Sequence, residues 1–144
     1  MAAVLVDAGA LIALLDRRDG HHGACVLALA SIHDPLVTVW PAVTEAMHLL
    51  AETPQGQDAL FAMMAEKALG LAPVGDADLP RMQTLMRKYR ELPMDFADAA
   101  LVRVAERDRL THILSFDRHF RVYALPNRAR FVVLPGSPPT SRTP

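Results

Sequence analysis

Acidic residues at widely separated positions are the residues of this 144-residue chain best suited to do chemistry together. Asp7 and Asp117 each follow a short apolar run, and Glu45 and Asp98 each lie beside the apolar face of a stretch with helical spacing. Carboxylate oxygens are the ligands that hard divalent cations such as Mg²⁺ and Mn²⁺ prefer. If these four side chains meet in the fold, we expect them to hold such an ion.

Asp98 is the most informative of the four acids, because its position conflicts with the pattern around it. The stretch 94–107 (MDFADAALVRVAER) has amphipathic spacing, and Asp98 shares its apolar face with Leu101, Val102 and Ala105. A buried carboxylate without a partner is costly, so it must be neutralised, hydrogen-bonded or placed next to a cation. We therefore expect the Asp98 carboxylate to point toward packed structure or into a pocket at its rim.

Each acid also has an ordinary structural interpretation. Asp7 and Asp95 precede helical stretches and can act as N-caps. Asp117 can form a turn, and Glu45 can lie on an exposed helix face. Electrostatics separates the two interpretations, since two carboxylates about 4 Å apart repel by roughly 4 kcal/mol at an effective dielectric constant near 20. Three or four together would consume much of a typical domain stability of about 5–15 kcal/mol, so converging acids require a compensating cation.

Strand-like and helix-like stretches alternate along the chain. Strands are predicted at 3–7, 35–40, 71–74, 111–115 and 130–134, and helices at 8–19, 21–32, 41–52, 57–69, 76–91 and 94–107. This alternation predicts an α/β sandwich with a mostly parallel sheet. Right-handed crossovers place the carboxyl ends of its strands at one edge, where open α/β sheets bind ligands. We expect the four acids to meet at that edge.

Length and composition favour one globular domain over residues 1–134. The chain is 51% hydrophobic, and its proline- and serine-rich end at 135–144 is expected to be a disordered tail. Cys25 is the only cysteine, which rules out an internal disulfide and fits a reducing compartment. The first apolar stretch lacks a basic region and is interrupted by Asp7 and Asp16, a pattern typical of neither a signal peptide nor a membrane span. We expect a cytoplasmic protein without membrane association.

Positive charge is concentrated at the carboxyl-terminal end. Residues 1–102 hold 13 acids and 7 bases, whereas residues 103–144 hold 8 arginines and 3 acids. Arginine binds phosphate through its planar guanidinium, although such a stretch can equally be a solvated surface. Arg118 and Arg121 follow Asp117 closely, together with His119, and could reach a phosphate beside a metal ion.

The other histidines give weaker indications of a site. His21 and His22 are adjacent, so on a helix their side chains diverge, and we interpret them as a polar surface pair. His48 lies one turn after Glu45, where it either lines the site or is exposed, and we favour exposure.

Four stretches of the sequence together resemble the acidic motifs of PIN-domain ribonucleases, above all those of VapC-type toxins of bacterial toxin–antitoxin pairs. In order they are VLVDAGALIALLDRRDGHH, VTEAMHLL, MDFADAALVRVAER and ILSFDRHF, within a resemblance that runs from Val4 to Leu134. The resemblance implies a three-layer PIN-like sandwich, in which helices flank a small central sheet. It also implies Mg²⁺- or Mn²⁺-dependent hydrolysis of a phosphodiester in RNA.

The same resemblance implies a role for each acid. The catalytic metal ligands would be Asp7, Glu45, Asp98 and Asp117. Asp95 would be an extra metal-binding acid one turn earlier, which a subgroup of the family has. Which of Asp95 and Asp98 contacts the ion stays open. Arg118 and Arg121 would contact the RNA backbone. The fourth motif has Ser115 and Phe116 where a threonine and a polar residue are common, so a hydroxyl contact at Ser115 stays open.

The implied partners are an RNA substrate, a small cognate antitoxin and a second copy of the chain in a homodimer. The main alternatives are a non-catalytic α/β binding module, whose acids are only caps and turns, and a phosphoacceptor-type signalling domain. A receiver domain needs a lysine after a late strand, but the only lysines here are Lys67 and Lys88, both in predicted helices. A haloacid-dehalogenase-type phosphatase needs a second aspartate two residues after the first, where this chain has Gly9.

Overall fold

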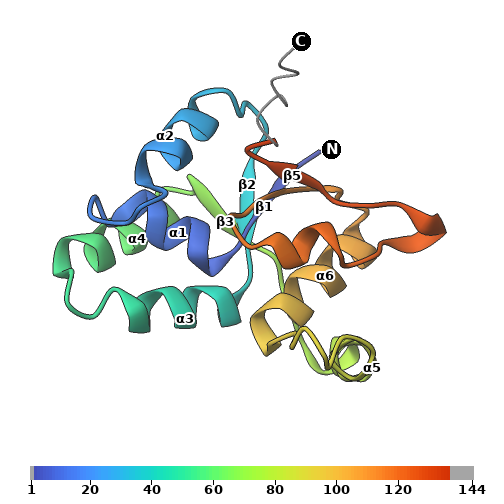
Figure 1. Cartoon of the computed structure of the whole chain (residues 1–144). Helices are drawn as coiled ribbons and strands as arrows, with labels where there is room; N and C mark the ends of the chain where they lie inside the picture. The colour runs from blue at the N-terminus through green and yellow to red at the C-terminus, as the bar shows by residue number, and fades with distance from the viewer. Residues whose placement is uncertain (1, 137–144) are drawn as a thin grey trace, which may run out of the picture.

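The computed structural model of the protein describes residues 2–136 and contains one five-stranded sheet. Its strands are β1 (Val4–Val6), β2 (Leu36–Thr38), β3 (Leu69–Leu71), β4 (His112–Leu114) and β5 (Val132–Leu134). They are all parallel, in the order β3-β2-β1-β4-β5 (Figure 1). Because β1 lies in the centre, with Leu5 opposite Val37 of β2 and Ile113 of β4, it is buried on both faces.

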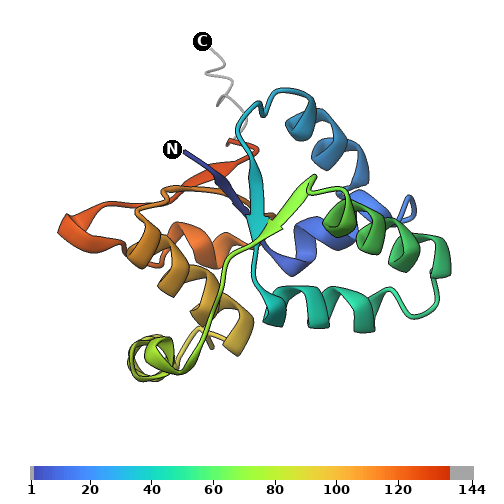
Figure 2. The same ribbon diagram turned by 180° about the vertical axis from the view of Figure 1, so that it is seen from behind.

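Helices cover the sheet on two sides, which makes a three-layer α/β sandwich. They are α1 (Ala8–Leu15), α2 (His22–Ala30), α3 (Trp40–Leu49), α4 (Pro54–Ala65), α5 (Leu79–Lys88) and α6 (Phe96–Asp108). Helices α1 to α4 gather on one side of the strands, and α5 and α6 lie on the other (Figures 1 and 2). Short 3₁₀ turns occur at η1 (Asp76–Asp78), η2 (Arg118–Arg121) and η3 (Pro126–Arg128). The alternation of strands and helices thus produces the fold class predicted from the sequence.

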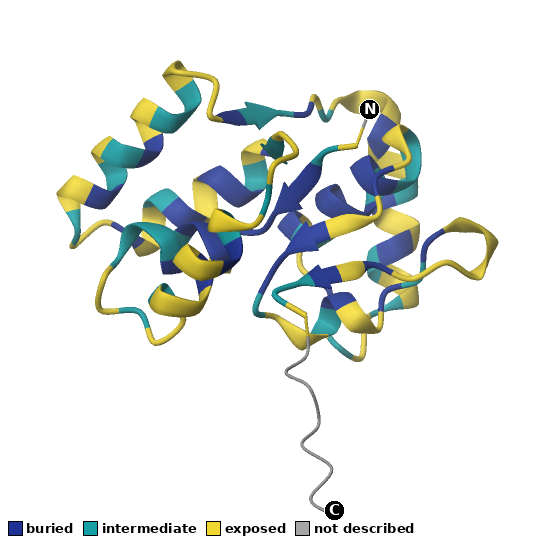
Figure 3. Cartoon of the chain, turned by 90° about the horizontal axis from the view of Figure 1, so that it is seen from above, coloured by how far each residue is buried: buried dark blue, intermediate teal, exposed yellow. Residues whose placement is uncertain are grey.

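The core lies between the sheet and the inner faces of the helices. Figure 3 shows buried residues along the central strands and on the sides of the helices that face them, with exposed residues outside. Helix α6 contributes more buried residues than any other described helix, among them the alanines Ala99 and Ala100 and the fully buried Leu101 and Val102. Close packing of this face fixes the position of the helix start, where Asp98 lies.

The sequence prediction was wrong about the third strand and the helix before it. The helix predicted at 57–69 is α4, which begins earlier, at Pro54, and ends at Ala65. The third strand, predicted at 71–74, is Leu69–Leu71. The chain turns between them at Lys67, whose φ of 63° is left-handed and stops the helix before the apolar residues that follow. Pro73 has no N–H group to donate to a neighbouring strand, which is consistent with the end of the edge strand β3 just before it.

Two arginines of the basic carboxyl-terminal segment serve the fold. Arg103 and Arg107 on α6 pair with Asp78, at nitrogen to oxygen distances of 2.9 and 3.2 Å. Arg81 on α5 forms a two-pronged pair with Glu106 on α6, with a closest distance of 2.7 Å. These pairs join α5 and its preceding turn to α6. Part of the arginine excess noted in the sequence is therefore structural.

Among residues 2–136, no helix is long and apolar enough to cross a membrane. The disordered tail predicted at 135–144 falls, from residue 137 onward, outside the described residues.

Candidate active site

All five acids singled out in the sequence line one cavity of about 290 Å³ at the carboxyl-terminal edge of the sheet. We call it the acid cavity, and its lining residues are Asp7, Ala8, Gly9, Asp19, His21, Glu45, Asp95, Asp98, Phe116 and Asp117. The acids come from the end of β1, from α3, from the start of α6 and from the segment after β4. The topology rule for parallel strands thus brings together residues that are far apart in the sequence.

Asp7 combines a structural and a site position. Its Oδ1 accepts a hydrogen bond from the amide of Ala10 at 2.8 Å, as an N-cap of α1, and its Oδ2 accepts one from the hydroxyl of Ser115. The side chain is buried, and this desolvation raises its pKa to about 6. The two hydrogen bonds lower the pKa and repulsion from Asp117 and Glu45 raises it, but burial is the largest effect.

Asp98 occupies the partly buried position that the amphipathic pattern predicted. Desolvation raises its pKa to about 7, repulsion from Asp95 adds to the rise, and a hydrogen bond from Tyr123 opposes it. The Tyr123 hydroxyl donates to Asp98 Oδ2 at 2.9 Å. Asp95 is exposed and caps α6, because its Oδ1 accepts from the amide of Asp98 at 2.8 Å. Asp98 is therefore the acid held inside the site, and Asp95 lies at its rim.

Glu45 and Asp117 are the other two of the five acids singled out in the sequence that line the cavity. Glu45 lies on the exposed side of α3, and the pKa of its carboxyl is raised by desolvation and by repulsion from Asp95 and Asp117. Asp117 caps η2, where its Oδ1 accepts a hydrogen bond from the amide of His119 at 2.9 Å. Caps and site residues are thus not alternatives here, because a carboxylate oxygen that accepts one hydrogen bond keeps a further lone pair for another contact.

The chemistry of these donors fits a hard divalent cation. Within residues 2–136 no group of three or more His, Cys, Asp or Glu side chains is already arranged to hold a metal ion. The cavity nevertheless gathers carboxylates whose pKa values are raised by burial and mutual repulsion, the condition that a cation relieves. Oxygen ligands of this kind suit Mg²⁺ or Mn²⁺ rather than softer metals.

Arg118 and Arg121 lie beside the acid cavity. Both are exposed on η2 and line a second hollow of about 230 Å³, here called the arginine hollow. Phe116 and Asp117 line both the acid cavity and the arginine hollow, so the two are adjacent. Two exposed arginines therefore line the hollow next to the acid cavity.

Several residues of the site were not identified from the sequence. For Ser115 the sequence left a hydroxyl contact open, because a threonine is common at this position. In the structure the Ser115 hydroxyl does contact Asp7. Tyr123 follows Asp98 by 25 residues and had no periodic signal that could point to it. Asp19 and His21 also line the acid cavity, and His21 is exposed there, in agreement with its interpretation as a surface residue. The sequence feature that could have pointed to Asp19 and His21 is the short DGHH stretch, which lies between two predicted helices.

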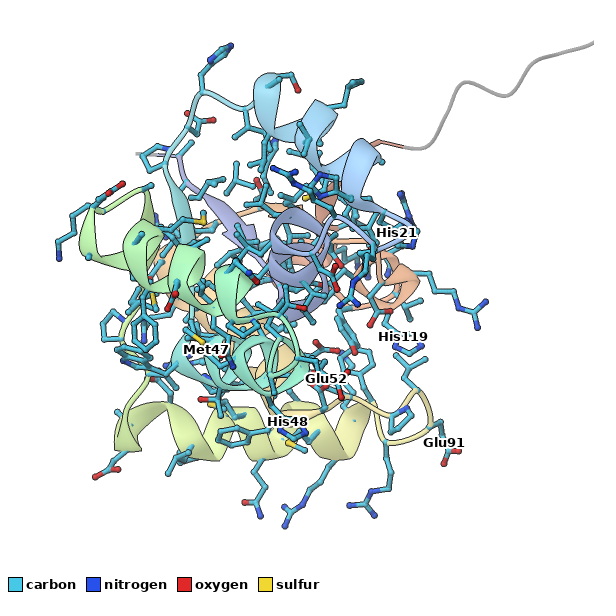
Figure 4. The ribbon with its side chains drawn as sticks, turned by 90° about the vertical axis from the view of Figure 1, so that its left-hand side faces the viewer. His21, Met47, His48, Glu52, Glu91 and His119 are labelled. Atoms are coloured by element: carbon cyan, nitrogen blue, oxygen red, sulfur yellow. The ribbon has the colours of Figure 1, made fainter. Side chains whose placement is uncertain are left out.

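His48 is exposed, as favoured from the sequence. With Glu45 and Asp95 it lines a neighbouring hollow of about 560 Å³, whose wall also contains the exposed aromatic rings of Trp40 and Phe96. We call this the apolar hollow. In Figure 4, His48 lies below α3, while His21 and His119 lie together at one side of the view.

Comparisons with known proteins agree with the fold and identify the family. The family model of the PIN domain matches residues 4–125. Ribonuclease VapC26 of Mycobacterium tuberculosis is 35% identical over 136 residues, covering 92% of this chain and 100% of that protein.

Solved structures share the architecture at lower identity. VapC20 of M. tuberculosis, described as a sarcin-ricin loop cleaving toxin, matches with a TM-score of 0.74 at 19% identity, over 80% of this chain and 90% of that one. A toxin–antitoxin complex from Klebsiella pneumoniae matches with a TM-score of 0.62 at 18% identity, over 80% and 87% of the two chains. VapBC2 of Rickettsia felis, bound to a DNA fragment from its promoter, matches with a TM-score of 0.60 at 11% identity, over 92% and 97%. The chain belongs to the PIN-domain family and, within it, to the VapC-type ribonucleases.

Proposed function

We propose that this protein is a metal-dependent endoribonuclease, which hydrolyses phosphodiester bonds in RNA as the toxin of a type II toxin–antitoxin pair. The observation that carries the proposal is the acid cavity, where the five acids singled out in the sequence, from four separate segments, meet at one edge of the sheet. The identity of 35% to a VapC ribonuclease over nearly the whole chain supports the same reaction.

In the proposed site Asp7 and Asp98 are the principal metal ligands, and Glu45 and Asp117 bind directly or through water. A bound Mg²⁺ or Mn²⁺ ion would polarise the phosphate and make a bound water more acidic. Ser115 and Tyr123 hold the carboxylates of Asp7 and Asp98 in fixed orientations, because each donates its hydroxyl to one oxygen of its acid. Asp95 adds negative charge at the rim, where it is exposed.

Arg118 and Arg121 are proposed to bind the RNA backbone beyond the scissile phosphate. Their side chains line the arginine hollow, which shares Phe116 and Asp117 with the acid cavity. Contacts of arginine with phosphates position a nucleic acid without reading its sequence, and they depend strongly on salt.

Two protein partners are proposed, an antitoxin and a second copy of the chain. Two of the similar solved structures are toxin–antitoxin complexes, which supports a small antitoxin that covers the site. For the homodimer, the supporting surface is the apolar hollow and a larger hollow of about 850 Å³ that shares Phe96 with it. Trp40, Leu79 and Phe96 are between 46% and 56% exposed there, an apolar surface that a partner would cover. We propose a cytoplasmic location, because an RNA substrate and an antitoxin would both be available there.

The test is cleavage of a panel of labelled single-stranded and structured RNAs by the full chain, with Mg²⁺, Mn²⁺ or EDTA. We expect defined fragments with either metal, none with EDTA, and none from Asp98→Asn. Asp34→Asn is the matched control, because Asp34 is exposed and precedes β2 at the opposite edge of the sheet. A non-catalytic binding module would give no fragments under any of these conditions.

A further inference from the structure

His21 and Phe116 form an aromatic stack in the wall of the acid cavity. Their ring centroids lie 4.5 Å apart with planes inclined by 13°, so the rings are nearly parallel. Both residues line the cavity together with the five acids. The two rings come from segments that are far apart in sequence, since His21 precedes α2 and Phe116 follows β4.

Local contacts hold this stack in place. The backbone N–H of His21 donates to Asp19 Oδ1 at 2.8 Å, and Nδ1 of the next residue, His22, lies 2.7 Å from the carbonyl oxygen of Ala13 in α1. Phe116 is half-buried and packs against the hydrophobic core. The turn that carries His21 is therefore fixed before any ligand arrives, and Figure 4 shows His21 at the edge of the α1 and α2 region.

The His21 ring is stacked on one side and the residue is exposed to solvent. Phe116 covers one face of the imidazole, and His21 as a whole is exposed. A parallel aromatic stack with a free outer face can accept one more planar ring. Unpaired RNA bases are commonly bound in this way, by stacking on aromatic or histidine side chains.

The position of the stack relates it to the RNA chain. Phe116 lines the acid cavity and also the arginine hollow, so the stack stands between the proposed hydrolytic site and the proposed backbone contacts. A phosphodiester placed at the acids has its neighbouring base within reach of this wall.

We propose that His21 and Phe116 form a platform on which the nucleobase next to the scissile phosphodiester stacks, so that the enzyme acts at an unpaired nucleotide. This inference rests on the proposed ribonuclease function and specifies its substrate as RNA with an accessible base at that position. A base inside a duplex is covered on both faces by its neighbours and cannot stack on His21.

The experiment uses one oligoribonucleotide that the wild-type chain cleaves at a single position, and versions of it that lack one base on either side of that position. Removal of the stacked base should raise the wild-type KM about tenfold, the scale of a lost base stack. His21→Ala should raise KM by a similar factor on intact RNA but add little on RNA that lacks the base. His21→Phe should keep KM within about twofold of wild type, whereas His21→Asn should behave as His21→Ala does. His33→Ala, at another exposed histidine, is the control and should leave KM unchanged.

Two results would overturn the platform. If His21→Asn retains a normal KM and His21→Phe does not, His21 acts through a hydrogen bond instead. If the His21→Ala penalty is equal with and without the base, the residue has only a structural role, which thermal unfolding of the variant would also reveal.

A second measurement keeps the inference testable if the proposed function itself fails. An RNA labelled with the fluorescent base 2-aminopurine is mixed with the full chain in EDTA, where no cleavage occurs. Stacking should quench the fluorescence with the wild type and with His21→Phe, but not with His21→Ala. No quenching at any labelled position with the wild type contradicts the platform, whereas absence of cleavage with Mg²⁺ and Mn²⁺ contradicts the ribonuclease.

Discussion

Substitution of Asp98 by asparagine should stabilise the metal-free protein while it abolishes cleavage. The carboxylate is partly buried and close to other acids, and its pKa is raised to about 7, chiefly by desolvation. Asparagine has nearly the same shape, carries no charge and keeps an oxygen that can accept the hydrogen bond from Tyr123. The substitution therefore removes the electrostatic cost without removing the contact.

The magnitude follows from the pKa. The folded state raises the pKa of Asp98 from 3.8 to about 7, so it favours the protonated carboxyl more than the unfolded state does. The folded protein is therefore more stable below about pH 4, where Asp98 is protonated, and it loses this stability as the pH rises through about 7. At about 1.4 kcal/mol per pKa unit, the ionised group costs at most about 4 kcal/mol at pH 8. Solvent reaches part of the side chain and screens it, so we expect a gain of about 1–2 kcal/mol from Asp98→Asn. For a domain of this size that corresponds to a rise in Tm of about 5 °C.

The assay is thermal unfolding in EDTA at pH 4 and pH 8, followed by circular dichroism. The variant should unfold about 5 °C above the wild type at pH 8 and at nearly the same temperature at pH 4. Mn²⁺ should raise the Tm of the wild type more than that of the variant, because a ligand bound only by the folded state stabilises it. Asp34→Asn should change neither value, since Asp34 is exposed at the other edge of the sheet. A lower Tm for Asp98→Asn at pH 8, or an equal gain at both pH values, would refute the electrostatic reasoning.

Three further predictions concern the surroundings of the acids. Tyr123→Phe removes the hydroxyl that donates to Asp98 Oδ2, so the pKa of Asp98 should rise further and cleavage should fall about tenfold, measured by carboxyl NMR titration and single-turnover kinetics. Replacement of both Arg118 and Arg121 by serine should weaken RNA binding and reduce the slope of log affinity against log salt by about 1–2, measured by fluorescence anisotropy in EDTA. Phe96→Glu should convert a homodimer to a monomer in size-exclusion chromatography with light scattering, because it places a charge in the exposed apolar surface.

Each of these predictions has a control or a contrary outcome. Tyr123→Phe keeps the ring that packs edge-on against Phe120, so a large loss of Tm would mean that its effect on cleavage is structural. Arg128→Ser changes an exposed arginine of η3 and should leave the salt slope unchanged if the arginine hollow binds the RNA. Leu27→Glu changes another exposed apolar residue, on α2, and should leave the dimer intact. A monomeric wild type would remove the proposed role of Phe96.

The sequence predicted the placement of the acids well, because strand topology and helix periodicity constrain the positions of residues that are far apart in the chain. Apolar runs that end in Asp7 and just before Asp117 identified two strand ends, and parallel topology then required those ends to share an edge. The amphipathic face of the helix at 94–107 likewise indicated that Asp98 points inward, and the structure agrees. The roles of these residues in catalysis and the extent of the domain over residues 1–134 stay predictions.

The sequence could not predict the contacts that complete the site. The hydrogen bond from Tyr123 to Asp98 and the stack of His21 on Phe116 join segments that have no common period, so only the assembled fold brings them together. The boundaries of three-residue strands are equally hard to place, because one left-handed residue, Lys67, decides where a helix stops. The sequence also did not show that an acid can cap a helix and line the cavity at the same time, although a carboxylate has enough acceptor positions for both.

The position of β4 next to β1 has a consequence for how the protein is made. Leu114 supplies the carbonyl oxygen that accepts from the amide of Asp7 at 3.4 Å, and Ser115 supplies the hydroxyl on the Asp7 carboxylate. Asp117, the last of the five acids, is translated two residues later. A nascent chain or a degradation fragment that ends before β4 therefore lacks both the support of Asp7 and the part of the cavity wall that Phe116 and Asp117 form. During synthesis the complete acid cavity can form only after Asp117 has been added to the chain.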